Sequence, residues 1–145
     1  MLFKKILVPY DGSACSMHAF QISMDMAKKY NSHVTILYCL QTDFRIPWYG
    51  FDSRMGDAIK KKQKDIALKN IAQLESNAKK AGVKVSSKIS ESHSIVKTLV
   101  SFAESNNISL IVMGSHGRTG FDKLLLGSVA HGVSHRARCP VLIVK

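Results

Sequence analysis

Short apolar runs alternate along the chain with longer segments in which apolar residues recur every three or four positions. The runs are rich in β-branched residues and end at turn-forming residues, a pattern typical of buried strands. They predict strands at 4–8, 33–40, 110–113 and 141–144. Apolar and polar residues alternate from Val83 to Ile89, which predicts one further, half-buried strand.

The segments between these strands show the apolar period of amphipathic helices. The expected helices are 14–30, capped by Ser13; 57–81; one that begins after Ser92 or Ser94 and ends at 106–107; and 128–137. Gly82 stands where a helix C-terminus favours a positive φ. Residues 41–56 show no clear period, so we expect a long loop there that contains Trp48 and Tyr49.

Strands that alternate with helices predict an α/β fold with a parallel sheet covered on both faces. Right-handed crossovers make this a doubly wound sheet. The chain has 145 residues and shows no internal repeat or linker, so we expect residues 1–145 to form a single domain.

The charge is strongly basic, with 21 Lys and Arg against 10 Asp and Glu, a net charge of +11. Many of the lysines lie on the predicted helix 57–81, where acidic residues are interleaved and aromatic residues are lacking. A solvated helix face explains this pattern, and the lack of stacking residues argues against nucleic-acid binding. Attraction to a polyanion such as a nucleoside triphosphate is still expected.

The chain contains no apolar run of about 18 residues, so we expect no membrane span. Its first apolar run is too short for a signal peptide, and we expect a cytoplasmic protein. Cys15, Cys39 and Cys139 are odd in number and form no C-x-x-C, which argues against disulfides or a zinc site. We interpret them as small hydrophobic residues.

Two glycine-containing loops follow predicted strands, at 9–13 and at 114–128. Ligands of doubly wound sheets bind beyond the carboxyl ends of the strands. Gly114, Gly117 and the pair Gly127-Ser128 suggest a cradle of backbone N–H groups for phosphates, with Arg118 and Lys123 beside it. A loop followed by a capped helix is the simpler alternative. The spacing matches neither a P-loop nor G-x-G-x-x-G, so it predicts only a phosphate-bearing ligand.

The pattern G-x2-G-x9-G-S resembles that of ATP-binding universal stress proteins, and the resemblance covers the whole chain. It extends over KKILVPYDGS, IVMGSHGRTG, LLLGSVA and CPVLIVK. The resemblance implies a Rossmann-like sheet ordered 3-2-1-4-5, similar to that of adenine nucleotide alpha hydrolases. It also implies ATP between the loops after strands one and four, with Mg²⁺ or Mn²⁺ on the phosphates.

The resemblance also implies roles for particular residues. Pro9, Asp11 and the backbone at Cys39 would line the adenine and ribose end. The positions beside the ribose and the phosphates would be Met113, Gly114, Gly117, Gly127, Ser128 and Val129. The family often has valine in place of Cys39, and a main-chain contact survives that change more readily than a side-chain contact.

Asp11 and Ser128 each have a second interpretation. Asp11 can accept a bond from a ribose hydroxyl or hold a metal-bound water, but it can also bond to the backbone of its own turn. Ser128 can donate to a phosphate, or it can serve as the N-cap of the last helix.

The sequence contains no convincing catalytic set. His116 lies in the glycine loop, where it can contact a phosphate, act as a base or simply face solvent. His131 and His135 have metal-like spacing, but no third ligand is apparent and Gly132 lies between them, so we interpret them as a surface pair. Cys15, near a helix N-terminus, is a weak candidate for a redox role.

The leading hypothesis is therefore a nucleotide-dependent switch in a stress response, whose ATP occupancy a still unknown partner protein detects. The alternatives are a slow ATPase or other nucleotide-using enzyme, and an interaction module whose pocket stays empty. The last strand, from Val141 to Val144, is apolar and expected at a sheet edge. Similar proteins dimerise through this strand, so we expect a homodimer.

Overall fold

The computed structural model describes residues 2–41, 53–117 and 126–145, with backbone only for 53–55. Its strands are β1 (Lys5–Tyr10), β2 (His33–Gln41), β3 (Lys84–Ser92), β4 (Leu110–Gly114) and β5 (Val141–Val144). Its helices are α1 (Ala14–Tyr30), α2 (Ser53–Lys80), α3 (Ile95–Ser105) and α4 (Ser128–Arg136). The strict alternation of strands and helices matches the prediction.

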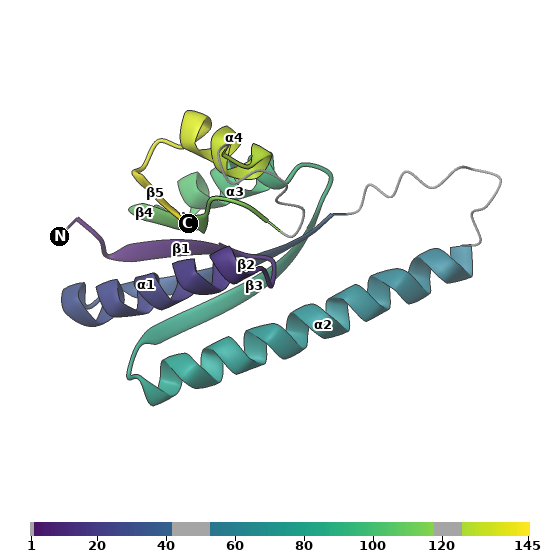
Figure 1. The fold of residues 1–145 in the computed structure, drawn as a ribbon, viewed down its shortest axis with the longest axis horizontal. Coiled ribbons are helices and arrows are strands. Elements are labelled where there is room, and N and C mark those ends of the chain that lie inside the picture. Colours follow the sequence, from purple (N-terminus) through teal and green to yellow (C-terminus); the bar gives the residue numbers. More distant parts are fainter. Residues whose placement is uncertain (1, 42–52, 118–125) are drawn as a thin grey trace.

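The strands form one parallel sheet in the order β3-β2-β1-β4-β5 (Figure 1). This confirms the predicted fold class and strand order. Helices α1 and α2 pack on one face of the sheet, around residues such as Phe20 and Leu74. Helices α3 and α4 pack on the other face, around Leu99 and Val133. Because both faces are covered, β1 and β4 are continuous apolar runs rather than alternating ones.

One predicted boundary was wrong, and the structure decides another that the sequence left open between two serines. Helix α2 begins at Ser53, four residues before the predicted start, because its first turns extend beyond the sheet and require no apolar face (Figure 1). The cap of α3 is Ser94, whose hydroxyl accepts a bond from Lys97 N. The other candidate, Ser92, ends β3 and accepts a bond from Ser94 N.

The predicted end of α2 is confirmed, since Gly82 has φ +71°. The expected loop at 41–56 lies mostly outside the described residues, and so do Trp48 and Tyr49. No helix within the described part of the chain is long and apolar enough to cross a membrane.

The sheet opens between β1 and β4 at the carboxyl ends of the strands. Strand β1 pairs with β2 as far as Tyr10, but its register with β4 covers only Ile6 and Leu7. After Leu7 the two strands are no longer paired with each other. The winding direction reverses between these two strands, and such a switch point is where doubly wound sheets bind ligands.

Candidate functional site

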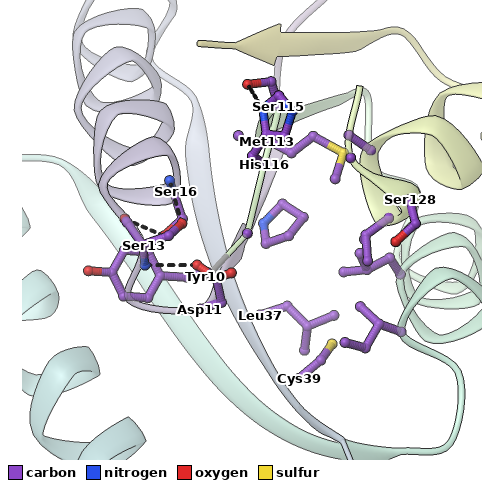
Figure 2. Close-up of a pocket in the computed structure, with 18 of the residues that line it drawn as sticks. Tyr10, Asp11, Ser13, Ser16, Leu37, Cys39, Met113, Ser115, His116 and Ser128 are labelled. Carbon is purple, nitrogen blue, oxygen red and sulfur yellow. Dashed lines mark hydrogen bonds between the residues drawn. The ribbon is translucent and has the colours of Figure 1, made fainter. Parts of the chain in front are cut away.

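A pocket with a volume of about 540 Å³ lies at this opening, within the range of about 300–1,000 Å³ that is usual for ligand sites. It is lined by the carboxyl ends of β1, β2 and β4 and by the first turns of α1, α3 and α4 (Figure 2). Its lining includes the predicted residues Pro9, Asp11, Cys39, Met113, Gly114, Gly117, Gly127, Ser128 and Val129. The remaining predicted residue, Arg118, lies outside the described residues, and so does Lys123.

The first turn of α1 is capped by side chains of the protein itself. The hydroxyl of Ser13 accepts a hydrogen bond from Ser16 N at 3.2 Å, as the sequence predicted. Asp11 Oδ1 accepts a bond from Ser13 N at 2.8 Å. The turn interpretation of Asp11 is therefore correct for one carboxylate oxygen. It leaves the second oxygen for another contact.

The first turn of α4 has no such cap. Gly127 is its N-cap residue and makes no side-chain hydrogen bond, while Ser128 is the first residue inside the helix. The interpretation of Ser128 as the N-cap was therefore wrong. The backbone N–H groups of a first turn have no partner within their own helix. In α4 these groups lie at the pocket, together with the positive end of the helix dipole.

The glycines of the loop lack a side chain for different structural reasons. A Cβ on Gly114 would lie 2.6 Å from Cys15 Cβ and 2.9 Å from the Cys15 carbonyl carbon. A Cβ on Gly127 would lie 2.7 Å from Ser115 O, which also accepts the Gly127 N–H at 2.8 Å. Gly114 thus lets α1 pack against β4, and Gly127 lets two loop segments meet. Their missing side chains leave room for the protein's own atoms.

The missing side chain of Gly117 faces a carboxylate of the pocket rather than backbone. A Cβ there would lie 2.8 Å from Asp11 Oδ2, the carboxylate oxygen that does not bond to Ser13 N. The loop after β4 therefore brings its backbone close to the carboxylate at the end of β1. Figure 2 shows Asp11 on one side of the pocket and Ser128 on the other.

The pocket has an apolar side, to which Leu37, Cys39, Ile95 and Leu99 contribute. Burial raises the pKa of the Cys39 thiol from 9.0 to about 11. Cys39 therefore remains a neutral thiol at pH 7 and offers an apolar surface rather than a nucleophile. The sequence pattern did not indicate the other three residues as pocket residues, because only their place in the fold distinguishes them from ordinary core residues.

His116 and Ser115 add polar groups to the pocket lining. The Ser115 hydroxyl and His116 Nδ1 lie 3.0 Å apart and share a hydrogen bond. The other ring nitrogen of His116, Nε2, is buried and has no partner among the described residues. A buried nitrogen without a partner is costly in a protein alone. The simple interpretation of His116 as a solvent-facing loop residue was therefore wrong.

Among the described residues that line the pocket, Asp11 supplies the one carboxylate and His116 the one imidazole. Within the described residues, no three side chains of His, Cys, Asp or Glu come together in a way that could hold a metal ion. The three cysteines are free and half-buried. What the pocket offers is an apolar side, a carboxylate and a helix N-terminus that can bind an anion.

Two known proteins are similar in sequence to this chain over nearly its whole length. Universal stress protein MJ0531 of Methanocaldococcus jannaschii is 35% identical over 99% of this chain and 83% of its own length. Universal stress protein YxiE of Bacillus subtilis is 30% identical over 99% of this chain and all of its own.

Among solved structures, universal stress protein UspA from Lactobacillus plantarum has a TM-score of 0.90 at 20% identity and covers 100% of this chain and 99% of its own. The universal stress protein from Archaeoglobus fulgidus in complex with dAMP has a TM-score of 0.70 at 20% identity, with both chains fully covered. Residues 2–145 match the profile of the Universal stress protein family. The chain therefore belongs to the universal stress protein family.

Proposed function

We propose that this protein binds ATP, with the phosphates at the first turn of α4. The observation that carries the proposal is the uncapped N-terminus of α4 within a ligand-sized pocket. Free N–H groups and the helix dipole favour a phosphate there. The hydroxyl of Ser128 and the backbone N–H groups of Gly117 and Val129 are the groups we assign to the phosphates. Gly127, whose own N–H is bonded to Ser115 O, would lie beside the phosphates without donating to them.

The other end of the nucleotide fits the apolar side of the pocket. We assign Pro9 and Cys39 to the adenine, and Met113 and Gly114 to the neighbourhood of the ribose. Cys39 fits this role because its thiol stays neutral. The dAMP complex of the Archaeoglobus relative supports an adenine nucleotide as the class of ligand.

Asp11 is the residue we assign to a ribose hydroxyl or to the water of a bound cation. Its Oδ2 is the oxygen that remains beside Gly117. A divalent ion such as Mg²⁺ or Mn²⁺ would neutralise part of the phosphate charge. One carboxylate can hold such an ion only together with phosphate oxygens and water, because the described residues of the pocket lining include no further acidic side chain.

We further propose that ATP occupancy acts as a switch in a cytoplasmic stress response and that a partner protein detects it. The protein would act as a homodimer joined through β5. Strand β5 is at the edge of the sheet, and its apolar Leu142 is 40% exposed. A bare apolar edge favours pairing with a second copy.

Nucleotide release tests the ligand. The purified protein is denatured, and the released nucleotides are separated by chromatography; the native protein is then melted with and without millimolar ATP and Mg²⁺. Bound ATP, and a stabilisation of about 3 kcal/mol at a hundredfold excess over Kd, are expected. Predominant ADP together with turnover would favour the enzyme alternative. No nucleotide and no thermal shift would favour an empty interaction module.

Light scattering at micromolar concentration tests the dimer. The unchanged protein is expected to have twice the mass of one chain. Replacing the exposed Leu142 with Lys puts a charge on the edge strand and should shift the mass towards that of one chain. A monomeric unchanged protein would contradict the dimer and leave the ATP proposal intact.

A further inference from the structure

Two histidines lie one turn apart on α4, away from the pocket lining. His131 and His135 are both exposed. Their rings are nearly parallel, with an interplanar angle of 11° and centroids 6.2 Å apart. Residues four apart on a helix are neighbours on the same face, so both imidazoles face the same region of solvent.

Gly132, which lies between them, has a packing role. A Cβ at this position would lie 2.8 Å from Val96 Cγ2 of α3. The neighbouring Val133 is fully buried. The close approach of Gly132 to Val96 and the burial of Val133 show that this face of α4 packs against the body of the protein, while the two histidines lie outside. Gly132 therefore does not weaken the case for a metal site, although the sequence alone suggested that it does.

The helix beneath the two histidines is regular. His131 N donates to Gly127 O at 2.8 Å, and Ala137 N donates to Val133 O at 2.8 Å. The helical backbone thus continues on both sides of the pair. A pair of side chains on such a helix is preorganised, because binding needs only rotation of the exposed rings.

Other histidines of the described residues use a ring nitrogen within the protein. His18 Nδ1 lies 3.0 Å from Lys145 O, and His33 Nε2 lies 2.8 Å from the Ser86 hydroxyl. His116 Nδ1 is bonded to Ser115. His131 and His135 differ from these histidines, because their rings are exposed and lie parallel to each other.

From this geometry we propose that His131 and His135 together bind a divalent transition-metal ion of the class of Ni²⁺, Cu²⁺ and Zn²⁺. Neutral imidazole nitrogen is a preferred ligand of these ions. No third protein ligand stands beside the pair among the described residues, so water fills the remaining coordination positions. The site is separate from the proposed ATP site and does not depend on it.

Calorimetric titration of the nucleotide-free protein with Ni²⁺ tests the site. The test variant exchanges two neighbouring exposed residues, His135→Arg with Arg136→His. The exchange keeps the composition and charge of the chain but moves the second imidazole off the shared face. The unchanged protein should bind one Ni²⁺ per chain. The exchange variant should bind it at least about tenfold more weakly, because the second ligand no longer adds its chelating contribution. Equal affinity would overturn the proposal.

Two further measurements keep the test independent of folding. The variants are melted without metal, and equal melting temperatures show that the exchange has not disturbed α4. Electron paramagnetic resonance of Cu²⁺ then counts coordinated imidazoles. Two nitrogens in the unchanged protein and one in His131→Ala are expected. A spectrum that His131→Ala leaves unchanged would overturn the proposal.

Discussion

Helices α1 and α4 both begin at the carboxyl edge of the sheet, on the two sides of one pocket, yet their first turns differ. The first turn of α1 is closed by Ser13, which accepts from Ser16 N, and Ser13 N in turn donates to Asp11. The first turn of α4 follows Gly127 and has no side-chain cap. The protein satisfies one helix end internally and leaves the other available.

This difference separates structural from ligand-binding roles within a single pocket. The cap of α1 uses the N–H group of Ser16 and places the Ser13 oxygen at the first turn, so it adds stability rather than affinity for an anion. An uncapped first turn lowers the stability of its helix and keeps its N–H groups for a ligand. We therefore expect substitutions around α1 to change folding and substitutions around α4 to change binding.

The largest effect is expected from Gly114→Ala, on the α1 side. The new methyl group would overlap Cys15 of α1, so α1 or β4 must shift. The free energy of unfolding should fall by about 2 kcal/mol in urea denaturation. Gly117→Ala is the control, because its methyl group meets only the movable carboxylate of Asp11. If both variants are equally stable, Gly114 does not have the packing role assigned to it.

A negative charge introduced at the first turn of α4 should change binding more than folding. Ser128→Asp places a carboxylate at the first turn, which stabilises the helix by about 0.3–1 kcal/mol but repels phosphate. ATP affinity, measured by calorimetry, should fall at least about tenfold, or about 1.4 kcal/mol. The neutral Ser128→Asn is the control and should bind nearly as well as the unchanged protein. Unchanged affinity in Ser128→Asp would place the phosphates elsewhere.

Removal of the cap of α1 should have the opposite effect, with a change in stability and little change in ATP affinity. Ser13→Ala loses the bond to Ser16 N and should lower the free energy of unfolding by about 1 kcal/mol. ATP affinity should change little, since the proposed phosphate site is at α4. Denaturation and calorimetry on the same preparation separate the two effects. A large loss of affinity at unchanged stability would make α1 the anion site and reverse the comparison.

The smallest change in stability is expected from Asp11→Asn. The amide oxygen can still accept from Ser13 N, so the free energy of unfolding should change by less than about 0.5 kcal/mol. The lost charge should reduce the dependence of ATP affinity on Mg²⁺, measured by titration with and without the ion. Asp11→Ala, which also loses the acceptor, is the less stable control. An unchanged Mg²⁺ dependence in Asp11→Asn would exclude Asp11 from the cation site.

Much of the fold could be predicted from the sequence. Apolar runs such as 110–113 identified the strands, and periodic apolar residues identified the helices, because burial imposes these two periods. The start of α2 was missed since its first turns lie beyond the sheet (Figure 1). The strand order came from resemblance to a family, because alternation alone does not determine which strands become neighbours.

By itself, the sequence determined the α/β fold class, the loops that follow β1 and β4, and the residue types available for a ligand. Only the tertiary structure decided what each of those residues faces. Gly114 and Gly117 are both glycines of the same loop, yet Gly114 faces helix α1 and Gly117 faces Asp11. The physical reason is that a missing side chain acquires its role from whichever atoms the fold brings to that position, and those atoms come from residues distant in the chain.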